Sequence, residues 1–168
     1  MSAPRAVVAG AADRPEIAAL RTRVFVEEQG VPAEIEQDDA DETAVHALSR
    51  DGSGRVVATG RLLLRDGAPA TIGRMATDSS ARGGGHGAAV LAELHRQAAL
   101  RGHREVELHA QLSARGFYER AGYTPVGQEY TEAGIAHITM RRSLPAPDGA
   151  DVTDRSGDAE TRPVRPSE

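Results

Sequence analysis

Cysteine and lysine are both missing from this chain of 168 residues. Without cysteine, the chain cannot form structural disulfides, a thiolate zinc site or a cysteine acyl-enzyme. All 20 basic residues are arginine, which excludes Schiff-base chemistry on lysine and the capture of phosphate by a P-loop lysine. Any group transfer must therefore follow another route.

An excess of positive charge and a long apolar run are also missing. The formal net charge of −5 argues against broad nucleic-acid binding, which needs a basic face. No apolar run reaches the roughly 18 residues of a membrane span. The segment 1–5 lacks the apolar core of a signal peptide. We therefore expect a cytoplasmic protein with no nucleic-acid or membrane partner.

Composition divides the chain into a folded unit and a tail. Residues 145–168 are rich in proline, acidic residues and small polar residues, and they contain almost nothing with which to form a core. The remainder shows no internal repeat. We expect one domain over residues 4–144 and a disordered tail over residues 145–168.

The domain opens with a predicted helix and an acidic segment. Asp13 and Glu16 resemble a capping box around Pro15, and apolar residues then recur at helical spacing up to about Glu28. Residues 30–43, which are rich in acidic side chains, are predicted to form an exposed loop. Two interpretations of the loop stay open, namely attraction of a cationic acceptor or ordinary solvated surface.

Hairpin signals dominate the centre of the domain. The turn sequences Asp51-Gly52-Ser53-Gly54 and Asp66-Gly67-Ala68-Pro69 divide residues 44–77. We predict three antiparallel strands joined by hairpins over this region.

The second half of the domain predicts a crossover unit. A helix ending at Gly102 and a strand over residues 105–110 give a parallel pair by a right-handed crossover. A short helix over 114–121 and a strand over 135–142 follow. The predicted fold class is α/β (α+β), a mixed and mostly antiparallel sheet with a β-α-β core and flanking helices.

A glycine-rich turn lies at the centre of this unit. The sequence Arg82-Gly83-Gly84-Gly85-His86-Gly87-Ala88 follows a predicted strand and begins a predicted helix. Glycines let backbone N–H groups approach an anion, the helix N-terminus adds its positive dipole end, and Arg82 supplies a charge-assisted fork. The turn predicts a binding site for a diphosphate-bearing cofactor.

One interpretation of the turn is a dinucleotide fingerprint. The spacing Gly83-x-Gly85-x-x-Ala88 fits it, and Glu105 and Glu107 lie about 20 residues further on. A dinucleotide domain normally opens with this unit, whereas here three antiparallel strands precede it. The pattern as a whole disfavours this interpretation.

The alternative register, Arg82-x-x-Gly85-x-Gly87, resembles the pyrophosphate motif of the GNAT superfamily of acyl-CoA-dependent N-acyltransferases. The resemblance covers nearly the whole predicted domain. Segments 23–32 and 130–141 resemble the ElaA-like branch of that superfamily, and segment 23–32 also resembles the opening of acyl-homoserine lactone synthases.

The resemblance implies a set of donor-binding residues. The fourth strand would pair with pantetheine through its backbone, and Gln111 stands where the family has an asparagine. His86 would bind through its backbone N–H. The implied acyl-CoA contacts are Met75, Ala76, Thr77, Arg82, Gly83, Gly84, Gly85, His86, Gly87, Ala88, Gln111 and Phe117.

The resemblance also implies catalytic roles. Tyr118 would act as the general acid that protonates the departing CoA thiolate, a role that suits a phenol with an ordinary pKa of about 10. The proton acceptor for the amine stays open between Glu28, His46 and His137, with Glu28 first because helix one borders the acceptor pocket in GNAT folds. His109 with Glu105 and Glu107 is too sparse a pattern for a metal, and none is expected.

We expect an N-acyltransferase that passes acetyl from acetyl-CoA directly to a small-molecule or peptide amine. The fold would also allow a homodimer. The alternative is a non-catalytic acyl-CoA-binding sensor, because the binding motif is clearer than any general base. The dinucleotide interpretation predicts binding of NAD(P) instead.

Overall fold

A seven-stranded sheet organises residues 3–146, which are the residues that the computed structural model describes. Its strands are β1 (Ala6–Val8), β2 (Val45–Arg50), β3 (Val56–Leu63), β4 (Ala70–Thr77), β5 (Glu105–Gln111), β6 (Thr124–Glu132) and β7 (Ile135–Ser143). They lie in the order β1-β2-β3-β4-β5-β7-β6, and β4 with β5 is the one parallel pair of this sheet. The predicted tail lies almost wholly outside the described residues.

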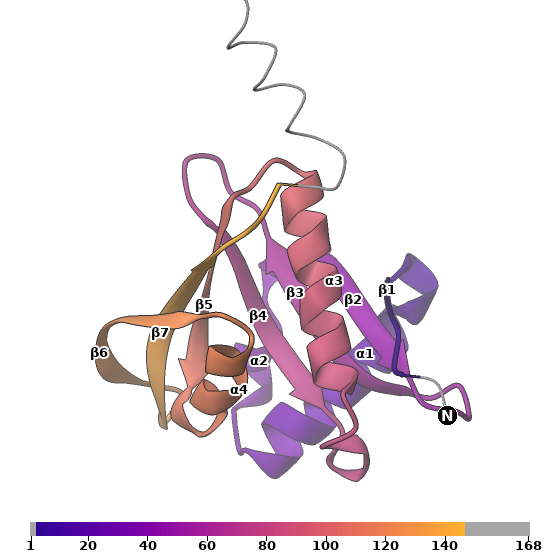
Figure 1. Ribbon diagram of the computed structural model, residues 1–168. Coiled ribbons are helices and arrows are strands. Elements are labelled where there is room, and N and C mark those ends of the chain that lie inside the picture. Colours follow the sequence, from indigo (N-terminus) through magenta and orange to yellow (C-terminus); the bar gives the residue numbers. More distant parts are fainter. Residues whose placement is uncertain (1–2, 147–168) are drawn as a thin grey trace, which may run out of the picture.

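Helices cover both faces of the sheet (Figure 1). The α-helices are α1 (Arg14–Arg21), α2 (Ala33–Glu36), α3 (His86–Leu100) and α4 (Arg115–Arg120). Helix α3 crosses one face and packs on a core that includes Leu62, Leu94 and Met140. Helix α1 lies behind the other face and packs on a second core that includes Leu20 and Leu48. The predicted mixed, mostly antiparallel sheet with flanking helices is confirmed.

The first helix differs from the prediction at both ends. Asp13 does not cap α1, because its Oδ2 accepts from the N–H of Gly10 at 2.9 Å and its Oδ1 accepts from Arg50 at 2.8 Å. Beyond Arg21 the chain continues as the π-helix η2 (Thr22–Glu28). A π-helix is rare and frequently lies at a functional site, so this wide turn marks the end of the helix as a candidate part of a site.

Two strands were not predicted. Strand β1 is only three residues long. Strand β6 is exposed along nearly its whole length and pairs only with β7, with an irregularity in register between Val126 and Tyr130. Its proline and glycine are tolerated because it is an edge strand.

Most of the acidic segment is exposed, as predicted, but the segment is partly helical and one of its carboxylates is buried. It contains α2 and the short 3-10 helix η3 (Asp39–Glu42), and Glu36 is only 3% exposed. The partners that permit this burial are arginines from other elements, described below.

Strand β4 bends and then separates from β5. Arg61 pairs with Gly73 and Thr59 with Ala76, so one extra residue of β4 bulges between these pairs. Arg74, with a φ of 52°, occupies the bulge. Pairing of β4 with β5 ends at Ile72 opposite Leu108, although β4 continues to Thr77. The sheet therefore opens at the carboxyl ends of its two parallel strands.

Candidate functional site

The opening between β4 and β5 forms a cleft of about 1210 Å³. It runs between the end of η2, the glycine turn before α3 and the start of α4. Every residue predicted to bind the donor lines it except Gly84, which lies in the same turn, and both predicted catalytic residues, Glu28 and Tyr118, line it as well. The structure thus brings together residues from distant parts of the chain.

The glycine turn presents a free helix N-terminus to the cleft. Helix α3 begins at His86 without a side-chain cap, and its first backbone bond joins the N–H of Ala89 to the carbonyl of Gly85. The N–H groups of His86, Gly87 and Ala88 therefore have no partner within the helix. Gly85 has a φ of 91°, which suits glycine at this point. The turn can accept an anion through backbone donors.

His86 turns its side chain away from this role. Its Nδ1 lies 2.8 Å from the hydroxyl of Ser49, which is fully buried in β2. The imidazole thus fastens the start of α3 to the sheet, while the backbone N–H stays available. This arrangement agrees with the expectation that His86 contributes through its backbone.

Arg82 and Glu28 form an ion pair with each other. The two Nη atoms of Arg82 lie 2.7 Å from the two carboxylate oxygens of Glu28, and its Nε donates to the carbonyl of Thr77 at 3.0 Å. The hydrogen bonds from Arg82 hold the pKa of Glu28 below its ordinary value. The residue predicted to bind phosphate and the residue predicted to accept a proton are therefore engaged with one another in this state.

Tyr118 is buried beside the cleft on the α3 side of the sheet. It packs edge-on against Phe117 and Tyr123, with ring centroids 5.0 and 5.7 Å away. Burial raises the pKa of its phenol well above the ordinary range. The hydroxyl therefore stays protonated, as a proton donor must.

The two candidate histidines differ in position. His46 is buried in β2, does not line the cleft, and contacts the backbone carbonyl of Asp41 through Nε2 at 3.0 Å. Burial lowers its pKa. His137 lines the cleft from β7, and its Nδ1 lies 2.7 Å from the carbonyl oxygen of Ile135. Of the two, only His137 faces the space in which a substrate would lie.

Gln111 bridges two walls of the cleft. Its Nε2 donates to Oε1 of Gln29 at 2.8 Å, which joins the end of β5 to the end of η2. Gln29 was not predicted as a site residue, and nothing in its local sequence pattern separates it from an ordinary polar helix end. The contact links the two sides of the opening.

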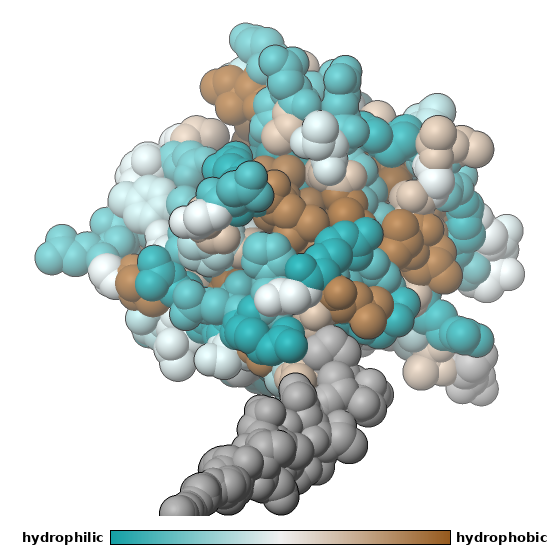
Figure 2. Space-filling model, turned by 90° about the horizontal axis from the view of Figure 1, so that it is seen from above, coloured by the Kyte–Doolittle hydropathy of each residue, from teal (hydrophilic) through white to brown (hydrophobic). Residues whose placement is uncertain are grey.

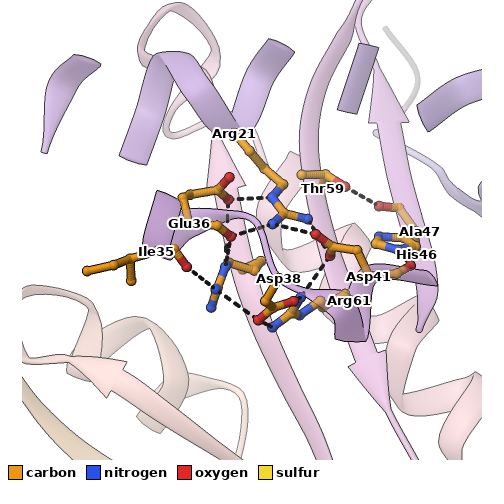
Figure 3. A network of polar contacts seen from close by, with 10 residues as sticks. Arg21, Ile35, Glu36, Asp38, Asp41, His46, Ala47, Thr59 and Arg61 are labelled. Atoms are coloured by element: carbon orange, nitrogen blue, oxygen red, sulfur yellow. Dashed lines mark hydrogen bonds and ion pairs between the residues drawn. The ribbon is translucent and has the colours of Figure 1, made fainter. Parts of the chain in front are cut away.

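A partly buried charge cluster, with Arg21, Glu36 and Arg61 buried, contributes to the wall of the cleft (Figure 3). We define it as Arg21, Glu36, Asp38, Asp41, Arg61 and Arg74. Arg21 contacts Glu36 through Nε at 2.5 Å and Asp41 through Nη1 at 2.8 Å. Arg61 donates to Asp38 at 2.6 Å and to Asp41 at 2.7 Å.

The charge cluster is balanced and leaves little free negative charge. Although burial opposes it, the hydrogen bonds from Arg21 and Arg61 hold the pKa of Asp41 far below its usual range. Arg74 reaches the same group, with its Nε 3.1 Å from the carbonyl of Glu36. The interpretation of residues 30–43 as solvated surface is therefore wrong for Glu36 and Asp41, because their carboxylates neutralise arginines.

Arg61 and Arg74 also line the cleft and were not predicted as site residues. One signal was present in the sequence: an arginine in the middle of a strand that is otherwise apolar, as in Val56–Leu63, requires a buried counter-charge. The acidic segment 30–43, which precedes this strand in the sequence, contains several carboxylates that could supply this counter-charge.

Neither a metal site nor a membrane-spanning helix is found among the described residues. No group of three or more His, Asp or Glu side chains among residues 3–146 is placed to hold a metal ion. None of the helices over the same residues is long and apolar enough to cross a membrane. Seen from above, apolar side chains reach the surface as separate patches among polar ones (Figure 2).

Comparisons with known proteins cover the same region. A family model described as "Acetyltransferase (GNAT) domain" matches residues 11–144. The uncharacterised N-acetyltransferase YjcF of Bacillus subtilis is 35% identical over 124 residues, covering 73% of this chain and 87% of that protein. The crystal structure of ElaA from Escherichia coli is 27% identical with a TM-score of 0.72, covering 83% of this chain and 99% of ElaA. An acyl-CoA N-acyltransferase from Pseudomonas aeruginosa is 29% identical, also with a TM-score of 0.72, covering 83% of this chain and 99% of that one.

Proposed function

The chain belongs to the GNAT acetyltransferase family, and from this premise we propose that it transfers an acetyl group from acetyl-CoA directly to the amine of a small molecule or peptide. The observation that carries the proposal is the continuous path from the free N-terminus of α3, along the part of β4 that β5 does not pair, to the hydroxyl of the buried Tyr118. Membership of the family supports acyl transfer in general. That the acyl group is acetyl and that the acceptor is an amine are parts of our proposal.

The donor fits this path from end to end. Its diphosphate would accept from the free N–H groups of His86, Gly87 and Ala88 and from Arg82. Its pantetheine amides would bond the backbone of β4 beyond Ile72, where β5 no longer does. A cleft of about 1210 Å³ exceeds the size of an ordinary ligand pocket, which leaves room for a second substrate.

The chemistry needs one proton donor at the leaving sulfur. The amine nitrogen attacks the thioester carbon, a C–N bond forms, and the C–S bond then breaks to release CoA thiolate. Tyr118 gives its phenolic proton to that sulfur as the bond breaks. Its burial on the α3 side keeps the proton in place until then.

The composition favours direct transfer over a cysteine acyl-enzyme, because the chain has no cysteine to hold the acyl group. In direct transfer both substrates would bind in one ternary complex. Holding the two reactants together lowers the entropy cost of their encounter.

Calorimetric titration with acetyl-CoA, with NADH as the comparison ligand, tests the donor, and release of CoA with a panel of amines tests the reaction. We expect Tyr118→Phe to keep the affinity for acetyl-CoA within about twofold and to lower turnover by about 10²–10⁴-fold. The matched control is Tyr123→Phe, since Tyr123 is equally buried but contacts His95 instead of the cleft. Unchanged turnover in Tyr118→Phe would remove the assignment of the acid. Tight acetyl-CoA binding with no amine turned over would favour a sensor.

A further inference from the structure

We propose that His137 accepts the proton of the attacking amine through Nε2, and that the backbone of its own strand prepares the imidazole for this task. The proposal rests on the proposed function and assigns the residue that it leaves open. It follows from the hydrogen bonding of the ring, from its packing and from its position across the sheet from Tyr118.

The hydrogen bond of the ring selects one tautomer. Nδ1 of His137 lies 2.7 Å from the carbonyl oxygen of Ile135. A carbonyl can only accept, so Nδ1 carries the proton and Nε2 of the neutral ring carries a lone pair. This lone pair is the group that a general base requires.

Packing holds the ring still. The imidazole stacks on Tyr130, with ring centroids 5.8 Å apart and an angle of 23° between the planes. Tyr130 is in turn held by its hydroxyl, 2.6 Å from Nδ1 of His109. Strand β7 is paired on both sides, by β5 and by β6. The orientation of the base is therefore set before any substrate binds.

The position of His137 complements that of Tyr118. His137 pairs with Gln111 across β5 and β7, and these two side chains share the sheet face opposite the α3 core. Their neighbours Ala110 and Ile138 point into the α3 core, where Tyr118 also packs. Because the cleft opens between the two faces, acid and base approach it from opposite sides.

This division suits the reaction. The amine would lose its proton to Nε2 of His137 as the C–N bond forms, and the sulfur would gain a proton from Tyr118 as the C–S bond breaks. Each proton transfer therefore has its own residue, and neither residue has to act as both acid and base within the step. The imidazolium formed on His137 keeps its bond to the Ile135 carbonyl, which stabilises the charged ring.

The other candidates are less suited to accept this proton. Without the donor, the carboxylate of Glu28 is bonded at both oxygens by Arg82, and once the donor takes Arg82, a free carboxylate is still a weaker base than a neutral imidazole. His46 does not line the cleft. His137 combines a free acceptor nitrogen with a place in the cleft wall.

The experiment compares two nucleophiles of different basicity. Propylamine is almost wholly protonated at neutral pH and its nitrogen stays basic as the C–N bond forms, so its proton needs an acceptor. Methoxyamine is almost wholly free base, and the proton that it loses as the C–N bond forms is acidic enough for water to take it. We expect His137→Gln to lower kcat/KM for propylamine by about 10²–10⁴-fold and for methoxyamine by less than about tenfold, with unchanged affinity for acetyl-CoA. The control is His103→Gln, on the turn after α3 and outside the cleft, which should leave both rates unchanged.

The outcomes separate the two proposals. Equal losses for both nucleophiles would show that His137 only supports the structure, and would overturn its role while leaving the proposed function intact. A wild-type protein that acetylates neither nucleophile nor any amine of the panel would overturn the proposed function itself.

A second measurement needs no amine substrate. In ¹⁵N NMR spectra of histidine-labelled protein, the signals lost in His137→Gln belong to His137. We expect its neutral ring to be protonated at Nδ1, the less common form for histidine free in water. A ring protonated at Nε2 would overturn the proposal.

Discussion

Replacing Glu28 by Gln tests whether Glu28 competes with the donor for Arg82. In the structure both Nη atoms of Arg82 contact the Glu28 carboxylate at 2.7 Å. A bound diphosphate would need the same guanidinium. Glu28→Gln should therefore tighten acetyl-CoA binding, whereas Arg82→Ala should weaken it.

The structure sets the size of both effects. The side chains of Arg82 and Glu28 are 44% and 41% exposed, and an exposed ion pair contributes only about 0.2–1 kcal/mol. Releasing Arg82 from it should lower the Kd of acetyl-CoA by about 1.4-fold to fivefold. Loss of Arg82 removes a hydrogen bond to a charged group, worth about 1.5–3 kcal/mol, so Arg82→Ala should raise the Kd by about 10-fold to 150-fold.

Calorimetric titration with acetyl-CoA and with acetyl-pantetheine measures these effects. Acetyl-pantetheine lacks the diphosphate, so its affinity should not respond to either variant. The control is Glu27→Gln, an adjacent exposed glutamate that removes the same charge without releasing Arg82. Weaker acetyl-CoA binding in Glu28→Gln, or equal shifts for the two ligands, would refute the competition.

Two further predictions concern stability. Burial, together with the charge of Arg142, lowers the pKa of His95 from 6.5 to about 4, so on acidification the unfolded chain binds this proton before the folded chain does. Urea titrations should therefore show about 3 kcal/mol of stability lost between pH 6.5 and 4. His95→Gln should reduce this loss. Gly60→Ala would place a methyl group against Met75 and should cost about 1–3 kcal/mol in thermal unfolding. Gly73→Ala, whose methyl group would meet no atom within 4 Å, should not. Similar losses in both variants would contradict the close packing of Gly60 against Met75.

Periodicity and turn residues predicted most of the sheet, because local patterns determine those elements. The hairpins over residues 44–77 and the crossover through α3 are confirmed. Strand β6 was missed because it has no alternating pattern and contains Pro125 and Gly127. It is held by pairing with β7, which is a tertiary effect.

The sequence also predicted residues that line the cleft, since the motif Arg82-x-x-Gly85-x-Gly87 is local. What the sequence could not show is which side chains satisfy one another. The contact of Arg82 with Glu28 spans 54 positions and that of Gln111 with Gln29 spans 82. The spacing of apolar residues also does not indicate that η2 is a π-helix. The positions of Glu28 and Gln29 at its end could therefore not be predicted from the sequence.

The charge cluster limits how this sequence can diverge. It sets three arginines against three carboxylates. Removing one member leaves a partner in the interior without its counter-charge, a change that is usually far more costly than replacing both members together. Substitutions here should therefore be tolerated as matched pairs, for example Arg61 with Asp41. In a mutational library, single changes at these positions should be depleted while particular double changes survive.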